Sequence, residues 1–571
     1  MSLPKNVRKL ALLVAVFACG SAATFGAWWL HGRPIAVPAA PLDGLNNGRI
    51  NCVSYAPYRD DQSPFTADFH VSPEQIDEDL TVLAGHTACV RTYSTGQDLT
   101  EVVPIAKRHG LKVLAGAWIG RDDEQNKREV AAVIKLANAY PDTVSAVIVG
   151  NEVLLRGDQE PKDLARYIRQ VKASVKVPVT FADVWEFWID APELAREVDF
   201  VTVHLLPYWE GEPMAVPRAL RHVAATVKKV QAKFPGKKIF VGEVGWPSLG
   251  RMREDARPSP SDQARFLRGF ITVARDLGVG YNLIEAFDQK WKRRSEGTVG
   301  GHWGLYDSNR KPKVELAGPV SDDPRWPIHW WVGTALGALI LATAMVGRPL
   351  PTGKARWIVT AGLLAAVSGA ALEAQAIYAS ETVRSAVGWL PAGAAFAMAA
   401  ALAVIAIQGM LARGEGGANA LCGNSQHILA ALMSRRIEPT GACLLEALEV
   451  VVLVFALAAA LGILFDGRQR DFPTFVYLVP ALSFMALWIG GSRVAGDRNP
   501  LAHGLTLVLA VTAAATVVNE HPWNTQALAW SAVAATLALP RLVEGMRFVW
   551  RLRQPRAAVK SRAAPRRAKP A

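Results

Sequence analysis

The stretch Val147-Ile148-Val149-Gly150-Asn151-Glu152 decides the fold prediction, because it has the pattern of a short buried strand that ends in polar residues. A second stretch, Phe240-Val241-Gly242-Glu243-Val244-Gly245-Trp246-Pro247, has the same form. In both, an apolar, β-branched run carries a glutamate at the point where the strand is expected to end. Polar groups at the ends of buried strands indicate a site built on a parallel sheet.

Similar apolar runs recur between residues 48 and 318, and a polar segment of helical length follows each of them. This alternation predicts an α/β fold, specifically a (β/α)8 TIM barrel, in which residues at the carboxyl ends of the strands build the active site. Ser72-Pro73-Glu74-Gln75 and Ser261-Asp262-Gln263 are expected to open two of the helices. The predicted strands are Ile50–Tyr55, Ala88–Tyr93, Lys112–Gly116, Ala146–Asn151, Val179–Asp183, Phe200–Val203, Ile239–Glu243 and Tyr281–Phe287.

Glu152 and Glu243 at the mouth of one barrel are typical of a glycosidase. One carboxyl group protonates the leaving glycosidic oxygen while the other attacks the anomeric carbon, and a separation of about 5–5.5 Å gives retention of configuration. A single glutamate at a strand end is more often an ordinary ion-pair partner. Two at matching positions favour catalysis.

The chain resembles glycoside hydrolase family 17 at Gly150-Asn151-Glu152-Val153 and Gly242-Glu243-Val244-Gly245-Trp246-Pro247-Ser248. Further similar stretches are Asn51–Tyr58, Val90–Tyr93, Ile284–Lys292 and His302–Leu305, so the resemblance covers about residues 48–318. It implies a retaining enzyme acting on β-1,3-glucan, with Glu152 as acid/base and Glu243 as nucleophile. The chain departs from the family at Gln289, where many members have a glutamate, and we expect Glu285 to replace that carboxylate.

Several other residues are expected to bind substrate. Asn151 is placed to hydrogen-bond the sugar 2-hydroxyl, and aromatic rings at strand ends can stack on pyranose C–H surfaces. Tyr208 is expected to hydrogen-bond the nucleophile, and Lys292 to pair with Glu243 or Glu285. The predicted binding residues are Tyr55, Arg91, Tyr93, Asn151, Tyr208, Trp246, Glu285, Trp291 and Lys292. No zinc-type cluster or phosphate-binding loop is present in the sequence, so no metal or other cofactor is expected.

The rest of the chain has the composition of a membrane protein. Residues 326–540 hold only 21 charged residues, and the chain as a whole is 51% apolar. An anchor is predicted within residues 1–31, at Leu10–Leu30, followed by a linker at 32–47; the alternative is a cleaved signal peptide. A seven-span domain is predicted at 326–543 and a basic tail at 544–571. The seven predicted spans are Trp326–Val346, Trp357–Gln375, Gly388–Leu411, Cys443–Phe465, Pro473–Gly491, Pro500–Val518 and Thr525–Val543.

Loop charges predict the orientation in the membrane. With the N-terminus inside, the loops on the inside hold eight basic residues and those outside hold three, and the tail also falls inside. The barrel then faces outward, which for a bacterium means the periplasmic side of the inner membrane. Because most of the net charge of +13 lies in the tail, where anionic lipid headgroups can hold it, nucleic acid is not an expected partner.

Cys52 and Cys89 lie in the exported part, where a disulfide is possible, but each sits inside an apolar strand pattern. We therefore expect buried free thiols at both positions.

The combination of barrel and spans resembles the membrane-bound bacterial β-(1,6)-glucan synthases of cyclic β-(1,3),(1,6)-glucan synthesis. This resemblance implies a glucanosyltransferase that cleaves β-1,3-glucan and forms β-1,6 linkages or branches. The expected partners are the lipid bilayer and a membrane glucan synthase. A tethered endo-β-1,3-glucanase is the first alternative. The second is a glucan export or synthase-partner module with a carbohydrate-binding barrel, suggested by Glu373, Glu446 and Glu449 inside predicted spans.

Overall fold

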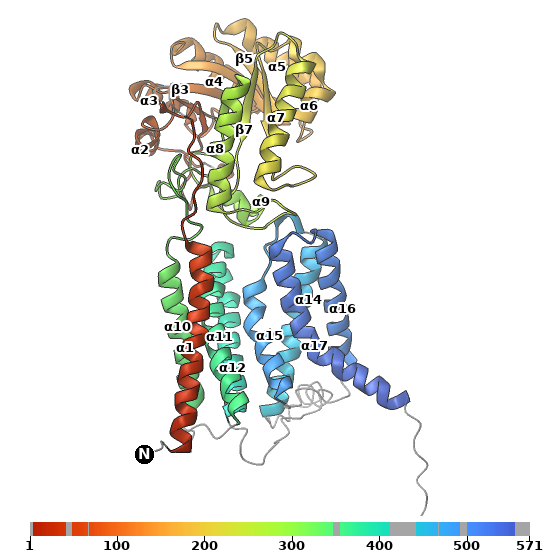
Figure 1. Cartoon of the computed structure of the whole chain (residues 1–571). Coiled ribbons are helices and arrows are strands. Elements are labelled where there is room, and N and C mark those ends of the chain that lie inside the picture. The colour runs from red at the N-terminus through yellow and green to blue at the C-terminus, as the bar shows by residue number, and fades with distance from the viewer. Residues whose placement is uncertain are drawn as a thin grey trace, which may run out of the picture.

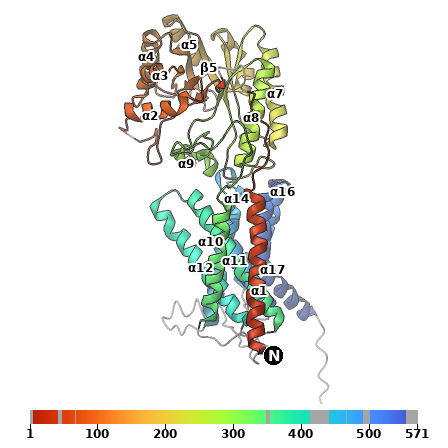
Figure 2. The same cartoon turned by 60° about the vertical axis from the view of Figure 1, so that its left-hand side comes forward.

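The computed structural model describes residues 4–41, 48–66, 68–346, 354–411, 441–465, 467–490 and 500–553. A barrel of strands and helices stands on one end of a bundle of long helices, and both views show the two parts stacked (Figures 1 and 2). We call the bundle, made of α1 and of α10 to α17, the helical domain.

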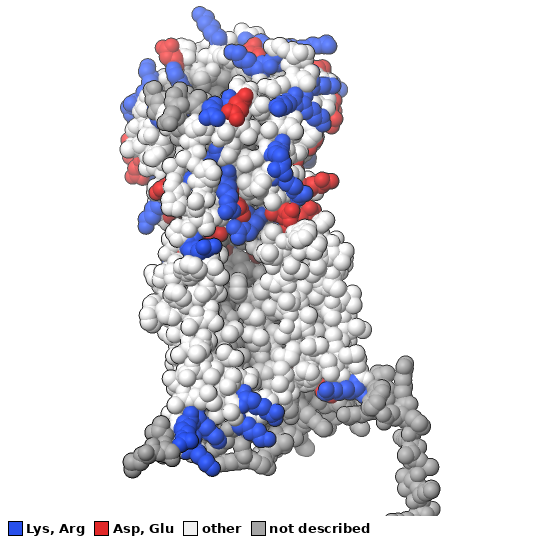
Figure 3. Space-filling view, viewed as in Figure 1, with Lys and Arg blue, Asp and Glu red and all other residues white. Residues whose placement is uncertain are grey.

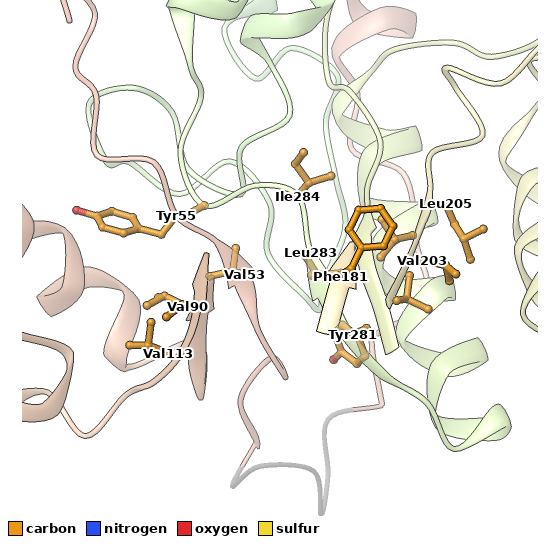
Figure 4. Close-up of a cluster of buried hydrophobic side chains, with 14 of the residues drawn as sticks. Val53, Tyr55, Val90, Val113, Phe181, Val203, Leu205, Tyr281, Leu283 and Ile284 are labelled. Carbon is orange, nitrogen blue, oxygen red and sulfur yellow. The ribbon is translucent and has the colours of Figure 1, made fainter. Parts of the chain in front are cut away.

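Within the described residues, eight parallel strands close into a barrel in chain order, β1 to β8, as the sequence predicts. Val53, Val90 and Val113 from the first three strands belong to one buried cluster with Leu283 from the neighbouring β8 and Phe181 from β5 (Figure 4). β-branched and aromatic side chains suit such buried strands. The strands are β1 (Val53–Ser54), β2 (Cys89–Arg91), β3 (Lys112–Ala117), β4 (Val144–Asn151), β5 (Val179–Val184), β6 (Val201–Leu205), β7 (Ile239–Val244) and β8 (Gly280–Leu283).

The first and last strands are shorter than predicted. Ile50 forms only an isolated bridge with Thr87. Beyond Ile284 the chain leaves β7: the Glu285 N–H donates to the Trp303 carbonyl at 3.2 Å and the Ala286 N–H to the Ser54 carbonyl at 2.9 Å. Residues 284–287 therefore form the rim of the site rather than continuing β8.

The helices around the barrel begin at the expected capping signals, with one shift. Ser72 accepts from the Gln75 N–H at 3.2 Å, as predicted, and the later helix is capped by Ser259 and begins at Pro260, one residue before the predicted Ser261. The barrel helices are α2 (Pro73–Ala84), α3 (Val102–Arg108), α4 (Asp123–Ala139), α5 (Pro161–Ser174), α6 (Trp185–Asp190), α7 (Val216–Lys233), α8 (Pro260–Leu277) and α9 (Arg293–Glu296).

Cys52 and Cys89 form a disulfide, so the prediction of free thiols was wrong. Cys52 directly precedes β1 and Cys89 begins β2, and these two strands are hydrogen-bonded neighbours. The pairing of β1 with β2 thus brings the two Cα atoms to 4.3 Å, a proximity that strand patterns alone do not reveal.

Each predicted apolar segment of the helical domain corresponds to a helix. Among the described residues, seven helices are long and apolar enough to cross a membrane, and α15 is a shorter apolar helix. The helices are α1 (Lys5–Gly32), α10 (Trp326–Met345), α11 (Ala355–Thr382), α12 (Trp389–Leu411), α14 (Gly441–Phe465), α15 (Thr474–Ile489), α16 (Pro500–Asn519) and α17 (Thr525–Arg553).

The first helix is an integral part of the helical domain. α1 packs against α10 and α11, and the Trp330 indole N–H donates to the Ser21 carbonyl at 2.9 Å. Just beyond α1, Ile35 pairs with Val320, so the segments that join the two domains run side by side. Residues 42–47 of the predicted linker lie outside the described residues.

Charge divides the surface into zones. Lys, Arg, Asp and Glu cover the barrel, a broad band over the helices is almost free of them on the visible face, and basic side chains gather at the far end (Figure 3). The predicted inner loops with Arg348, Arg413, Arg435, Arg436, Arg493 and Arg498, and the tail beyond residue 553, lie outside the described residues.

Candidate active site

The carboxyl ends of the barrel strands face the helical domain. A cleft of about 1230 Å³ opens there, lined by loops from most of the strands. Arg468 and Gln469, in the connection between α14 and α15, also line it. The cleft is therefore formed by both domains.

Glu152 and Glu243 come together in this cleft, as predicted. A carboxylate oxygen of each and a ring nitrogen of His204 all lie within 4.8 Å of one another. This spacing is close to the 5–5.5 Å of retaining glycosidases and well below the 6.5–9.5 Å of inverting enzymes, which must hold a water between the two groups. The geometry thus suits direct attack by one carboxylate on the anomeric carbon.

Glu243, the last residue but one of β7, is buried and hydrogen-bonded. Its Oε1 accepts from the Arg91 guanidinium at 3.0 Å and from the Tyr93 hydroxyl at 2.9 Å. Arg91 is itself buried, and it also donates to the Asn151 side chain and to the Gly242 carbonyl. Arg91 and Tyr93, both predicted site residues, therefore fix the carboxylate in orientation, as a nucleophile requires.

Glu152 follows β4, where the backbone turns sharply into the cleft. Gly150 has φ +87° and Glu152 has φ +53°, and the pairing of β4 with β5 is irregular between Ile148 and Asn151. A Cβ at position 150 would lie 2.5 Å from the Val153 side chain, so glycine is required there. This turn brings the Glu152 carboxyl beside His204, with 3.0 Å between Oε1 and Nδ1.

The environment of Glu152 sets its protonation. Burial opposes the charged form, but the hydrogen bond and charge of His204, with Arg91 and Arg156, together lower the pKa of Glu152 below its ordinary value. The hydrogen bond to His204 therefore favours the ionised form of Glu152 in the free enzyme. His204 is a positioning residue that controls when Glu152 can act as an acid.

Replacing His204 with Phe is expected to raise the pKa of Glu152, because burial then acts without the opposing hydrogen bond. A general acid loses activity as the pH rises through its pKa. The basic limb of the kcat/KM profile should consequently move to higher pH, and His204→Asn, which keeps a donor, should move it less. A pH profile on an oligosaccharide donor measures this; an unmoved basic limb in His204→Phe would contradict the role.

The same three side chains, Glu152, His204 and Glu243, offer three ligand atoms that could approach a metal ion. The Arg91 guanidinium, however, donates to Glu243 at 3.0 Å and lies 3.4 Å from the Nε2 of His204. A fixed positive charge at this point disfavours a cation, so the group is better suited to proton transfer than to metal binding.

Other predicted residues reach the cleft with defined partners. Tyr55, Tyr93, Asn151, Glu285, Trp291 and Lys292 line it. The Oδ1 of Asn151 accepts from Arg91, so its Nδ2 is the group left to meet a sugar hydroxyl. The Tyr55 hydroxyl instead donates to Asp79 at 3.1 Å, which restricts this residue to contact through its ring.

Lys292 pairs with Glu285, at 2.7 Å, rather than with Glu243. Burial raises the pKa of Glu285 to about 7, although the charge of Lys292 opposes the rise. Gln289, the departure from the family pattern, donates to the carbonyls of Ala56 and Phe287 and accepts from the Trp291 indole. Glu285 thus supplies a carboxyl group to this flank, while Gln289 fixes Trp291.

Two predicted residues do not have the expected roles. The Tyr208 hydroxyl donates to the Arg251 carbonyl at 2.6 Å, so the predicted bond to the nucleophile was wrong; Tyr93 makes it instead. Trp246 is fully buried, and its indole N–H donates to the Arg257 carbonyl at 2.9 Å. Both rings lie beneath the cleft because the chain turns away after β6 and β7.

Sequence reasoning missed several residues of the cleft. His204 lies near the end of β6. A polar residue near the end of a barrel strand is the sequence signal that could have placed it in the same site as the two glutamates. Trp209 and Trp303 stack with ring centroids 6.3 Å apart, and both line the cleft. Glu296, at the end of α9, adds another carboxyl group. Trp303 lies within the family-like stretch His302–Leu305 but was not singled out, and Glu296 lies in a short helix that carries no motif signal of its own.

The comparisons with known proteins agree with this site. The family model described as the BtgE/BtgC glycoside hydrolase domain matches residues 52–304. A glucan 1,3-beta-glucosidase of Arthroderma benhamiae is 30% identical over 255 residues, covering 42% of this chain and 82% of that protein. A glucan 1,3-beta-glucosidase of Saccharomyces cerevisiae is 26% identical and covers 43% of this chain and 85% of that protein.

A similar solved structure is the glycoside hydrolase family 17 beta-1,3-glucanosyltransferase of Rhizomucor miehei, with 25% identity and a TM-score of 0.42. It aligns with 47% of this chain and 98% of its own length. The likeness to the Arthroderma protein extends over most of that relative, and the family model spans the segments that carry Glu152 and Glu243. The chain therefore belongs to the BtgE/BtgC glycoside hydrolase family and is an enzyme of the glycoside hydrolase family 17 type.

Proposed function

We propose that this protein is a membrane-anchored, retaining glucanosyltransferase that cleaves β-1,3-glucan and joins the released chain to another glucan through β-1,6 linkages or branches. The observation that carries the proposal is the catalytic pair, Glu152 and Glu243, held within 4.8 Å in a cleft that faces the helical domain. The β-1,3-glucan substrate is supported by the names of the relatives.

The reaction follows from the geometry. Glu243 attacks the anomeric carbon and forms a glycosyl ester, while Glu152 protonates the glycosidic oxygen so that the reducing-end fragment leaves. Glu152 then takes the proton from an acceptor hydroxyl, the acceptor oxygen bonds to the anomeric carbon, and Glu243 is released. No nucleotide sugar is required, because the cleaved glycosidic bond supplies the energy.

The lining of the cleft favours a sugar acceptor over water. Tyr58, Phe65, Trp209, Trp291 and Trp303 give it extensive aromatic surface. Such rings bind pyranose faces and exclude water from the reacting ester. The covalent intermediate therefore persists long enough for a second glucan chain to bind and react.

The helical domain supports a membrane location. Seven of the described helices are long and apolar enough to span a bilayer, and basic side chains gather at the end away from the barrel (Figure 3). We infer an N-terminus inside the cell and a barrel on the outer side of a bacterial inner membrane. An active site facing the membrane suits glucan received from a membrane glucan synthase, the proposed partner.

The alternative of a tethered endo-β-1,3-glucanase is favoured by the names of the relatives, several of which are glucosidases. This enzyme would use the same two glutamates, and it would differ only in that water, rather than a sugar hydroxyl, is the acceptor. The export alternative has less support: Arg541 donates to Glu449 at 2.6 and 3.0 Å and lies 4.0 Å from Glu446, while Glu373 contacts His329 at 2.7 Å. An internal ion cluster accounts for these buried acids.

Product analysis separates transfer from hydrolysis. The full-length protein in lipid nanodiscs is incubated with a labelled β-1,3-gluco-oligosaccharide, and product lengths and linkages are determined. We expect products longer than the donor that contain 1,6 linkages. Products shorter than the donor alone would instead establish the tethered hydrolase, and an absence of turnover would move the assignment to binding or export.

A further inference from the structure

The loop between α14 and α15 reaches the barrel at the rim of the cleft. The Arg251 guanidinium donates to the Arg470 carbonyl at 2.6 Å and lies 4.4 Å from the Phe472 ring, and the Thr298 hydroxyl donates to Asp471 at 2.6 Å. These are contacts between segments about 170 to 220 residues apart in the chain. The loop is thus held against the barrel by the residues that directly follow Arg468 and Gln469.

Gln469 packs tightly on the barrel. Gly297, just after α9, has φ +76°, and a Cβ there would lie 2.6 Å from the Gln469 carbonyl oxygen. Figure 2 shows α9 between the barrel and the upper ends of the helices. A side chain at position 297 would push the loop away, so glycine permits this approach.

Arg468 faces the cleft. Its guanidinium lies 5.1 Å from the Trp209 ring, and Trp209 stacks on Trp303. The pKa of Glu296 is raised, first by burial, and the charges of Lys292 and Arg468 oppose the rise while those of Glu152 and Glu243 add to it. The charge of Arg468 therefore influences the pKa of the same carboxyl group, that of Glu296, as the charges of the catalytic pair do.

On the basis of the function proposed above, we propose that Arg468 and Gln469 of the helical domain form a substrate subsite. This subsite binds a glucose unit of the glucan chain beside the stacked rings of Trp209 and Trp303. An arginine offers five N–H donors for sugar hydroxyls, and an indole face receives the C–H surface of the same ring. The helical domain then determines which glucan chains the barrel accepts, in addition to anchoring it.

The test compares Arg468→Ala, Gln469→Ala and wild-type protein, all full length in nanodiscs. The donors are β-1,3-gluco-oligosaccharides of increasing length and an aryl β-glucoside short enough to occupy only the catalytic position. Loss of a hydrogen bond from a charged group should raise KM for long donors about tenfold. The aryl glucoside should react at the wild-type rate, within about twofold.

Arg470→Ala is the matched control. Its side chain packs toward Gly462 of α14, away from the cleft, and its backbone carbonyl, which Arg251 contacts, is retained in the variant. We expect wild-type KM for Arg470→Ala. Equal losses in Arg468→Ala and Arg470→Ala would assign the effect to docking of the loop and overturn the subsite.

Unchanged KM for every donor in Arg468→Ala and Gln469→Ala would also overturn the subsite, as would an equal loss on the aryl glucoside. Both outcomes leave the catalytic assignment intact, because wild-type turnover is measured in the same series. If the wild type itself fails to act on any glucan donor, the proposed function fails first.

Discussion

Replacing Glu243 with Gln is expected to lower kcat on a β-1,3-gluco-oligosaccharide by about 10⁴-fold or more, because the amide cannot form the glycosyl ester. The amide oxygen can still accept from Arg91 and Tyr93, which now donate to Oε1 of the carboxylate. Donor binding should therefore persist. Turnover and calorimetric binding, measured on the same preparation, separate loss of chemistry from loss of structure.

Glu197→Gln is a matched control for this replacement. Glu197 pairs with Arg169 at 2.8 Å on the outside of the barrel and does not line the cleft. Near wild-type turnover is expected, because exposed ion pairs contribute little to stability. If Glu243→Gln retained a substantial fraction of the wild-type rate, Glu243 would not be the nucleophile.

Replacing Glu152 with Ala is expected to slow cleavage of an unactivated glucan by about 10²–10⁴-fold, the usual contribution of a general acid. The effect should depend on the leaving group. A donor with an acidic phenol as leaving group needs no protonation, so the glycosyl ester on Glu243 still forms and then accumulates.

Added azide tests this interpretation directly. Because azide is already an anion, it needs no general base, and the cavity left by the Glu152 side chain admits it. Azide should restore turnover of the aryl donor and give a β-glycosyl azide, identified by mass spectrometry and NMR. A matching rescue of Glu243→Gln with a β product, or no rescue of Glu152→Ala, would argue against the assigned roles.

The sequence predicted the barrel well because its signals are local. Each strand is a short apolar run, and each is followed by a helix whose start is marked by residues such as Ser72 and Pro73. The glutamates could be assigned for the same reason, since Glu152 directly follows its strand and Glu243 is the last residue but one of its strand. A polar residue at the end of a buried strand must point into the mouth of the barrel.

The errors lie where side chains from distant segments meet. Tyr208 and Tyr93 both follow strand ends, but only Tyr93 contacts Glu243, because the next loop draws the Tyr208 hydroxyl to the Arg251 carbonyl. The bond between Cys52 and Cys89 likewise depends on the register of β1 against β2. Strand patterns do not predict the path of the loop that follows a strand, and they do not predict which two side chains point toward each other.

The contribution of the helical domain to the cleft could not be predicted at all. Arg468 lies between two apolar segments and reads as an ordinary charge in a loop outside the membrane. It lines the cleft because Arg251, Thr298 and Gly297 of the barrel hold its loop in place. Such docking depends on the relative placement of two domains, which sequence patterns do not encode locally.

The spacing of Glu152 and Glu243 carries the central claim, and the configuration of the first-formed product tests it most directly. Wild-type protein is mixed with a β-1,3-gluco-oligosaccharide in an NMR tube, and the anomeric proton at the newly formed carbon is followed before mutarotation. A separation within 4.8 Å predicts that this centre keeps the β configuration. An α product formed first would mean inversion through a water between the carboxylates and would contradict the account.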